Sequence, residues 1–559
     1  MGRRRTASLI AGAVALVATM LVVADDVSAW KPATHEAAAF EAYADAVDDG
    51  YVTIEGVSLP VEPELLAALR QFPESYRAGV LGPDAYPDIY VGQAMIHPDT
   101  VTDNDKLPAD PTRHSYTDDW IREVWSQSLL EPAGPNRLKV RAFAAGFLTH
   151  AAGDVWGHTF VNEFAQGVFP SITDVAEAPI AIRHVIVEGY VDSLRPVPIP
   201  DPADITQIDP PNEFITRVFI TSTFARTHSA PVHFDEFLDR RVRLQAQIDS
   251  DRAAAAANPF YGWVIAWRIN ANIASVAEID RGLAAWPQFS TTVAKALLAP
   301  ESNFAAARDA AVETGLLTVL PMYGVPRQLG EWFIAYRNWL RGLKAQLGAV
   351  VQPYLDWVDA VIDQGIDLVL KNFVDLSQLP PAMKAVVDTN GDGRLSIAEL
   401  RGLSKVDVLI NSPAILSSAD KARLDAAIGI GPARATFDTG SFHAFHDTAV
   451  MSKLILLSGD GLNQLAAAMG VSGRLYTSSN PLNDNVMIGW IRSIDGEYQW
   501  RSNSLRSGED RSFGFGTMPL WEDCQARDLV FRRIFVEPLP GAFAEAGDTC
   551  SDLAVPTAG

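Results

Sequence analysis

RAFAAGFLTHAAGDVWGH, residues 141–158, is the stretch from which the fold and the chemistry of this chain are best inferred. It is rich in alanine, apolar at helical spacing and free of proline, so it predicts a buried or half-buried helix. Side chains four residues apart lie one above the other on a helix, which puts His150, Asp154 and His158 on one ridge. Zinc binds imidazole nitrogen and carboxylate oxygen, so the ridge predicts a metal site. Histidines hydrogen-bonded in a core or at the surface are the alternative.

Two nearby features favour the metal interpretation. Gly153 and Gly157 lower helix propensity, but they allow another backbone or an ion to approach the helix closely. His184 and Glu188, in RHVIVEGYVD, repeat the four-residue spacing on a second expected helix. The two sets together favour a metal cluster over ordinary histidines.

The first 29 residues have the pattern of an export signal. Arg3, Arg4 and Arg5 precede the apolar run LIAGAVALVATMLVVA, and Val-Ser-Ala at 27–29 is a small-residue cleavage site. A retained membrane anchor is the alternative, although the run is short for a span. No later stretch is apolar and uncharged for long enough to cross a bilayer. We therefore expect a secreted or extracytoplasmic, soluble protein.

Composition limits the classes of partner. The formal net charge of −23 repels the phosphate backbone of nucleic acids, so no nucleic-acid partner is favoured. Phosphate chemistry remains compatible with this charge, because a cluster of divalent metals reverses the local field. No protein partner is implied.

Other possible ligands precede the central stretch. The expected helices there cover 35–47, 63–72 and 116–130, and a Gly- and Pro-punctuated segment separates the last two. That segment holds Asp84, Asp88, His97 and Asp99 as possible ligands or bases, with His114 after it. Histidines concentrate in the first third of the chain. Ligands of a metal cluster would be concentrated in this way, whereas core histidines would be scattered. Six of the ten lie there: His35, His97, His114, His150, His158 and His184.

These residues resemble the ligand series of the zinc-dependent phospholipase C superfamily, which also contains the fungal single-strand nucleases. Members are α-helical and begin at a tryptophan whose amine and carbonyl bind zinc. The match covers about 160 residues in order and approximate spacing. The matching positions are Trp30, His35, Asp84, His97, His150, Asp154, His158, His184 and Glu188.

The resemblance implies three zinc ions. Trp30, His35 and Asp154 would hold one. Asp84, His97, His150 and the bridging Asp154 would hold the second, and His158, His184 and Glu188 the third. His97 is preferred to His114 for its distance from Asp84.

The resemblance also implies a reaction. Two metals clamp the attacking and leaving oxygens of a phosphodiester and acidify a water molecule. The same resemblance puts Asp84 where it could orient or deprotonate that water.

The substrate is less constrained than the metals. The three-residue gap between Asp154 and His158 is tighter than in bacterial phospholipases C. HAAGDVWGH, with AGVLGPDAYPD, is more similar to glycosylphosphatidylinositol-specific phospholipase D, whereas the short Trp30–His35 gap is similar to the nucleases. We expect phospholipase C chemistry on phospholipid head groups. Phospholipase D-like cleavage, a nuclease, or a non-catalytic metal-stabilised lipid-binding protein are the alternatives.

A second metal site is predicted further along. Residues 388–399, DTNGDGRLSIAE, match the calcium-loop pattern D-x-N-x-D-G-x5-E. One such loop suits a structural calcium better than a calcium sensor, and an acidic loop without metal is the alternative. Asp388, Asn390, Asp392, the Arg394 carbonyl and Glu399 are the expected ligands.

The remaining regions are less informative. Aromatic residues at 332, 336, 339, 354 and 357 form either a lipid-contacting surface or, as is more common, helix core. Near the C-terminus, 485–494 and 497–504 read as strands joined by Asp-Gly, and Cys524 and Cys550 suggest one disulfide. His443 and His446 are expected to be structural.

The predicted fold class is mainly α. A chain of 559 residues exceeds what one ordinary core buries, so several units are expected. We predict a signal peptide (1–29), a helical zinc-phospholipase-like domain (30–282), a helical region with the EF-hand-type loop (283–429) and a small α+β unit (430–559).

Overall fold

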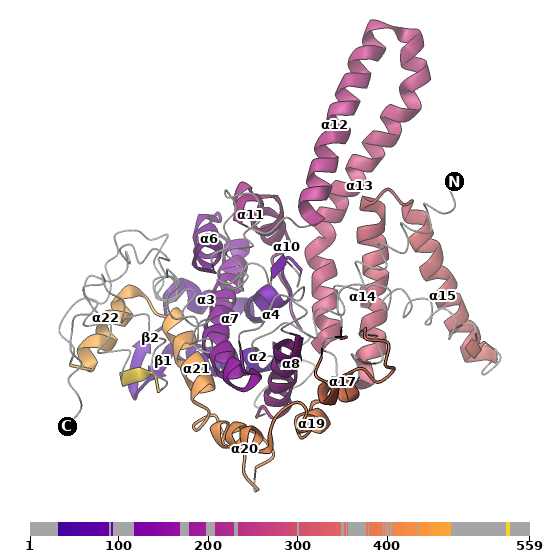
Figure 1. The fold of residues 1–559 in the computed structure, drawn as a ribbon. Coiled ribbons are helices and arrows are strands. Elements are labelled where there is room, and N and C mark those ends of the chain that lie inside the picture. Colours follow the sequence, from indigo (N-terminus) through magenta and orange to yellow (C-terminus); the bar gives the residue numbers. More distant parts are fainter. Residues whose placement is uncertain are drawn as a thin grey trace, which may run out of the picture.

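The computed structural model describes most of the chain between residues 32 and 470. The described residues are 32–88, 91–92, 117–167, 178–196, 207–228, 233–298, 301–347, 351–353, 355, 376–377, 379–394, 396, 399, 402, 405–432, 434–470 and 533–536. They are mainly helical, as predicted, and Figure 1 shows their arrangement. Within this part of the chain, no helix is long and apolar enough to cross a membrane.

Helix α7 (Pro135–Ala165) is the centre of the fold and contains the stretch quoted first. Pro135 suits the first turn, because the N–H group that proline lacks would have no hydrogen-bond partner within the helix there. At the other end Gln166 adopts a left-handed conformation and its N–H group donates to the Asn162 carbonyl. The helix is about 46 Å long at 1.5 Å per residue. Its buried alanines, such as Ala144 and Ala145, allow other helices to approach on several sides.

Six helices surround α7. They are α2 (Pro32–Asp49), α3 (Pro63–Gln71), α4 (Pro73–Leu81), α6 (Thr117–Leu130), α8 (Ala178–Ser193) and α21 (His443–Ile455). The predicted helix at 63–72 is α3, and Pro73 begins a further helix, α4, that the sequence analysis did not predict. An antiparallel hairpin of β1 (Tyr51–Ile54) and β2 (Val57–Pro60) joins α2 to α3. The sequence analysis did not predict it: Gly56 suits the tight turn, where its φ is +75°, but Glu55 is not one of the residues that usually precede glycine in such a turn.

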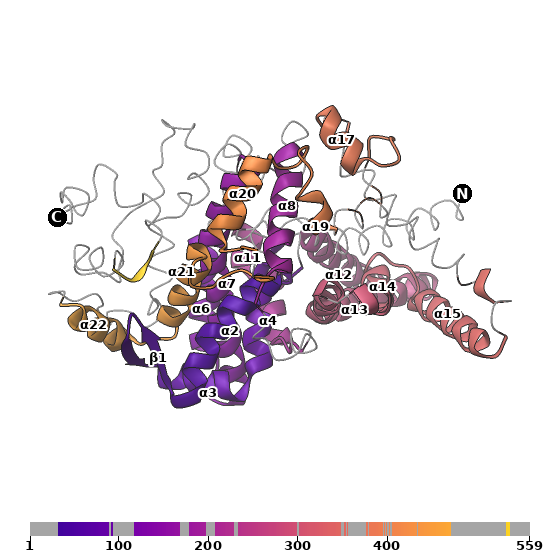
Figure 2. The ribbon, with the colours of Figure 1, turned by 90° about the horizontal axis from the view of Figure 1, so that it is seen from below.

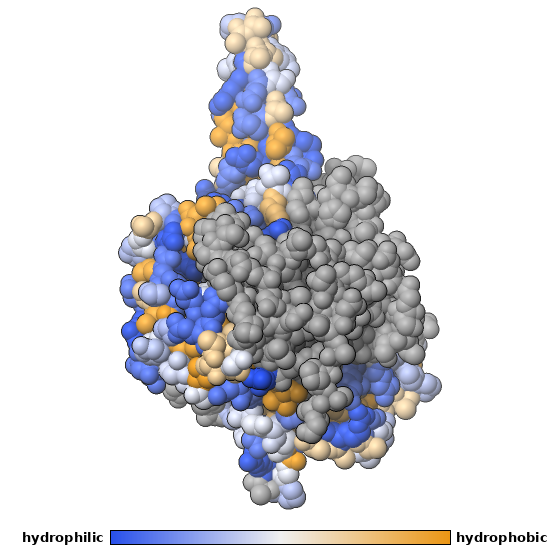
Figure 3. Space-filling model, turned by 90° about the vertical axis from the view of Figure 1, so that its left-hand side faces the viewer, coloured by the Kyte–Doolittle hydropathy of each residue, from blue (hydrophilic) through white to orange (hydrophobic). Residues whose placement is uncertain are grey.

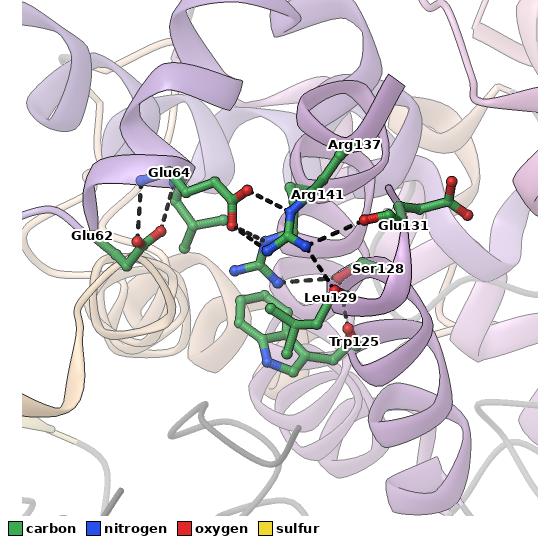
Figure 4. A network of polar contacts seen from close by, with 9 residues as sticks. Glu62, Glu64, Trp125, Ser128, Leu129, Glu131, Arg137 and Arg141 are labelled. Carbon is green, nitrogen blue, oxygen red and sulfur yellow. Dashed lines mark hydrogen bonds and ion pairs between the residues drawn. The ribbon is translucent and has the colours of Figure 1, made fainter. Parts of the chain in front are cut away.

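A polar network ties α3 and α6 to α7 (Figure 4). Arg137 donates from Nε and Nη2 to the two carboxylate oxygens of Glu64, at 2.5 and 2.9 Å, and from Nη1 to the Leu129 carbonyl. Arg141, one turn further along α7, donates to Ser128 Oγ and lies over the Trp125 ring. The network sets how α7 enters the bundle, ahead of the ridge of His150, Asp154 and His158.

Helices α12 (His233–Ala257), α13 (Pro259–Leu298), α14 (Glu301–Met322) and α15 (Arg327–Leu347) lie to one side of the bundle (Figures 1 and 2). The short elements α10 (Asn212–Ile215), η4 (Thr216–Thr221) and α11 (Thr223–His228) precede them. The predicted boundary between 282 and 283 falls inside α13, which is continuous there. Trp286 of α13 donates from Nε1 to Asp88 of the first region at 3.0 Å. The two regions therefore share one core instead of separating at that position.

Helix α15 carries two exposed tryptophans. Trp332 and Trp339 are 65% and 57% exposed, and the Tyr336 ring stacks against both. The interpretation of these two residues as helix core is therefore wrong. They lie on a face of α15 that is left exposed. The aromatic residues at 354 and 357 lie outside the described residues.

The last described helices also pack on the first region. After α17 (Pro381–Val387), α19 (Val406–Leu409) and α20 (Ser418–Ala427), helix α21 lies against α7 and α2, followed by α22 (Gly459–Ala468). The backbone N–H of Glu62 donates to the Leu456 carbonyl at 2.9 Å, and that of Phe437 to the Leu194 carbonyl at 2.7 Å. The described part of 430–559 is thus helical and shares the core of the bundle. The predicted strands and both cysteines lie outside the described residues.

Candidate metal centre

Three helices and one short turn bring the predicted ligands together. His35 lies in the first turn of α2, and Asp84 ends the 3-10 turn η1 (Gly82–Asp84). Helix α7 supplies three ligands on its ridge, and α8 supplies the pair at 184 and 188. All seven side chains are buried: His35, Asp84, His150, Asp154, His158, His184 and Glu188.

The first group forms around Asp154. Ligand atoms of His35, Asp84 and His150 lie within 4.8 Å of one another. Asp154 Oδ1 is 3.5 Å from His35 Nε2, and Asp154 Oδ2 is 3.2 Å from His150 Nε2. The rings of His35 and His150 stack with centroids 4.2 Å apart. Helices α2 and α7 and the turn η1 therefore present two imidazoles and two carboxylates to one small volume.

The second group adjoins the first. Ligand atoms of His158, His184 and Glu188 also lie within 4.8 Å of one another, with His184 Nε2 2.6 Å from Glu188 Oε1. His158 Nε2 is 3.8 Å from Asp154 Oδ1. Asp154 therefore has imidazole nitrogens from both groups around it.

The donor set fits zinc. Two ligand atoms bound to one tetrahedral zinc at about 2.1 Å lie about 3.4 Å apart. The distances of 3.2 and 3.5 Å from Asp154 to His150 and His35 match that separation. The imidazoles favour zinc over magnesium and calcium, which prefer oxygen ligands.

The backbone orients His150 for this role. Its Nδ1 lies 2.8 Å from the Val80 carbonyl oxygen. A carbonyl only accepts hydrogen bonds, so Nδ1 carries the proton and Nε2 faces Asp154. Second-shell contacts of this kind fix the tautomer of histidine ligands in metal sites.

The electrostatics of the cluster favour bound cations. Burial lowers the pKa of His150, but the carboxylates of Asp154 and Asp84 outweigh it and raise the pKa to about 9. The site thus holds enough negative charge to keep a proton on a buried imidazole, and a metal ion competes for the same nitrogen.

Glu36 is a buried acid beside the cluster that the sequence analysis missed. Burial raises its pKa to about 8, against the opposing charges of Arg77 and His150. Glu36 is therefore mostly protonated at neutral pH and is able to donate a hydrogen bond. Its position next to His35 in the chain is the one signal that pointed to it.

Some sequence candidates are placed elsewhere or are not described. Trp30, His97, Asp99 and His114 lie outside the described residues, so the choice between the two histidines stays a prediction. Asp88 is a structural residue, since it accepts from Trp286 Nε1 and from the backbone of Val91.

Two histidines near the C-terminus lie outside the two ligand groups. His446 Nδ1 lies 3.0 Å from Asp447 Oδ1, a pairing that suits the structural role expected of it. His443 begins α21.

The described residues of the loop at 388–399 adopt a turned conformation. Asp388 Oδ1 and Oδ2 accept from the N–H groups of Gly391 and Gly393, at 2.8 and 3.0 Å. Gly393, at the turn position of the motif, has a φ of +77°, which glycine adopts without strain. Carboxylate oxygens of Asp388, Asp392 and Glu399 lie within 4.8 Å of one another. The loop therefore gathers the three acidic side chains that the motif predicts.

Comparisons with family models, with curated proteins and with solved structures find no match to this chain.

Proposed function

We propose that this chain is an exported zinc-dependent phosphodiesterase that hydrolyses phospholipid head groups with phospholipase C chemistry. One observation carries the proposal. Seven of the nine residues that resemble the superfamily's ligand series are described, and these seven, though spread over more than 150 positions, gather in one buried cluster of two groups. Core histidines have no reason to converge on a shared carboxylate with zinc-like separations. The part of the proposal that concerns export rests on the sequence of residues 1–29 alone.

The resemblance implies how the ligands would divide among three zinc ions. His35 and Asp154 would hold one zinc, with Trp30 completing it. Asp84, His150 and Asp154 would hold the second, with His97, and the third would lie between His158, His184 and Glu188. When bound, zinc supplies the positive charge that polarises a phosphoryl oxygen and acidifies a water molecule.

The residues of the chain then handle the protons. Asp84 accepts a proton from the attacking water as its oxygen bonds to phosphorus. The bond from phosphorus to the glycerol oxygen breaks, and the leaving diacylglycerol oxygen takes up the proton that Asp84 accepted from the water, which returns Asp84 to its charged form. Asp154 stays charged and holds the imidazoles of both groups in place. The products are diacylglycerol and the phosphorylated head group.

Mass-spectrometric product analysis with phosphatidylcholine vesicles tests the reaction. Diacylglycerol with phosphocholine supports the proposal. Phosphatidate with choline would assign phospholipase D-like cleavage, and hydrolysis of single-stranded nucleic acid alone would assign a nuclease. Zinc binding without turnover on any of these substrates would leave a metal-stabilised lipid-binding protein.

Paired histidine variants test the site. His150→Ala should lose zinc and more than roughly 100-fold in activity, because even outer-shell changes at metal sites cost 10–100-fold. His446→Ala is the matched control, since this histidine pairs with Asp447 outside the cluster. Full activity of His150→Ala would exclude the cluster as the reaction centre.

We also propose that the loop at 388–399 binds one calcium ion in a structural role. Support comes from the motif together with the three clustered carboxylates and the left-handed Gly393. The helix entering the loop, α17, has only seven residues, so the loop has little helix to move as a sensor does.

A further inference from the structure

The hairpin of α12 and α13 ends in a charge-free tip. The two helices run side by side and their connection, near Ala257 and Pro259, stands clear of the rest of the molecule (Figures 1 and 3). Residues 253–267 contain no Asp, Glu, Lys or Arg, in a chain where 20% of residues are charged. The solvent-facing side of a helix normally carries charged and polar residues, so the lack of charge distinguishes this tip from other exposed helix surfaces.

Large aromatic side chains cover the tip. Phe260, Trp263 and Trp267 are 77%, 78% and 71% exposed. They are spaced three and four residues apart, so they lie on one face of α13. Tyr261 and Val264 are exposed beside them. A contiguous exposed patch of this kind marks an interaction surface, whereas single exposed apolar residues are ordinary.

Charge returns immediately below the tip. Arg268 of α13 donates from Nε and Nη2 to Asp251 of α12, at 2.8 and 2.7 Å, and ties the two helices together. Arg252, which follows Asp251 in α12, is exposed. From Asn258 to Trp267 the helix rises about 14 Å, roughly half of a 30 Å hydrocarbon core. The tip therefore has the depth of one membrane leaflet and a polar boundary at its base.

We infer that residues 253–267 dock this protein on a zwitterionic lipid bilayer. Phe260 and Tyr261, at the end of the hairpin, lie deepest, and Trp263 and Trp267 lie successively closer to the head-group level, where tryptophan is enriched. The net charge of −23 opposes an anionic leaflet, whereas an uncharged tip meets no such repulsion at a zwitterionic one.

A protein partner suits the tip less well. Two helices about 10 Å wide and 14 Å long present a face of about 300 Å². Stable protein interfaces bury about 800 Å² per partner.

The inference concerns lipid binding alone and does not rest on the proposed hydrolysis.

Flotation with phosphatidylcholine vesicles tests the inference on the full chain. The double variant Trp263→Ala/Trp267→Ala should partition at least roughly tenfold more weakly than the natural protein, since two aromatic rings no longer leave water. Trp332→Ala/Trp339→Ala is the matched control on α15, because both tryptophans are also more than half exposed. The control should bind as the natural protein does, and thermal unfolding should be unchanged in both variants.

Quenching by brominated phosphatidylcholine gives a second readout. Tryptophan fluorescence of the natural protein should be quenched, and the tip variant should lose that quenching. The inference is overturned if the tip variant floats unchanged, or if the α15 variant loses as much. A concentration-dependent dimer that needs the tip, without vesicle binding, would replace the bilayer by a second copy of the chain.

A variant at the metal cluster separates this inference from the proposed function. His150→Ala should bind vesicles as the natural protein does while turning over no lipid. If the natural protein floats but hydrolyses nothing, the docking inference stands and the proposed function fails.

Discussion

Asp154 is the residue on which the candidate metal centre depends. Imidazoles at positions 35, 150 and 158, from two helices, lie 3.2–3.8 Å from its carboxylate oxygens. Asp154→Asn keeps the size of the side chain but removes the charge and one acceptor oxygen. We expect lower zinc content and more than roughly 100-fold loss of hydrolysis. Metal analysis and product assays check this, and three retained zinc ions with full turnover would contradict the bridging role.

Gly153 makes room for a ligand from another helix. A Cβ atom there would lie 2.3 Å from His35 Nδ1 and 2.6 Å from Cε1. Gly153→Ala gains about 1 kcal/mol of helix propensity, but overpacking costs about 1–3 kcal/mol, so the net effect should be destabilising. Under the proposed function, the displaced ring should lose its zinc.

The readouts for Gly153→Ala are thermal unfolding and zinc content. The group formed by His158, His184 and Glu188 serves as an internal control, because its zinc should stay bound. A more stable variant with its full metal content would show that His35 does not need this space.

At the scale of elements, the contact of Glu64 with Arg137 predicts a pH effect. The hydrogen bonds from Arg137 lower the pKa of Glu64 below its ordinary 4.5, against the effect of burial. A lowered carboxyl pKa stabilises the fold above the ordinary pKa, and the contribution disappears as pH falls through the folded-state pKa. Glu64→Gln should therefore cost about 1 kcal/mol at neutral pH and progressively less below pH 4.5.

Chemical denaturation of Glu64→Gln and the natural protein over a pH series measures this difference. A constant difference at every pH would mean that packing, and not the ion pair, accounts for the effect.

The loop after α17 predicts a response to calcium. Calcium at 100 times its dissociation constant should stabilise the chain by about 2.7 kcal/mol if the loop unfolds with the rest. Glu399→Gln removes the bidentate ligand and should abolish the rise in melting temperature. Zinc content should stay constant, and Asp407→Asn, outside the loop, should respond as the natural protein does. An equal calcium response in Glu399→Gln would place the ion elsewhere.

At the scale of the whole molecule, the C-terminal helices complete the core of the bundle. Met451, Leu454, Ile455 and Leu456 are fully buried. Each contributes about 1.5–3 kcal/mol on burial, and together they match the 5–15 kcal/mol stability of a typical domain. A chain that ends after Gly429 should therefore fail to unfold cooperatively.

Calorimetry and gel filtration of two truncated chains check this prediction. A chain that ends after Val536 keeps α21, α22 and the buried Ile534 and Phe535, and it is the control, which should remain folded. If the shorter chain has the same melting temperature as the control, residues 30–429 fold independently of α21 and α22.

The sequence by itself determined the features that depend on local spacing. Helices at 35–47, 116–130 and 141–158 lie where predicted. Composition and the helical spacing of apolar residues over a few turns are enough to predict a helix. The ridge of His150, Asp154 and His158 follows from the helical period alone. The glycine at position 393 was likewise predicted from its place in the loop motif.

Tertiary structure decided the features that depend on residues far apart in the chain. Packing of α2 and η1 on α7 brings His35 and Asp84 to Asp154, and no local pattern encodes that approach. The continuity of α13 across residue 282, the burial of α21 and the exposure of Trp263 and Trp332 were decided in the same way. Burial is a property of the assembled core. A helical pattern alone therefore does not distinguish a buried aromatic side chain from an exposed one.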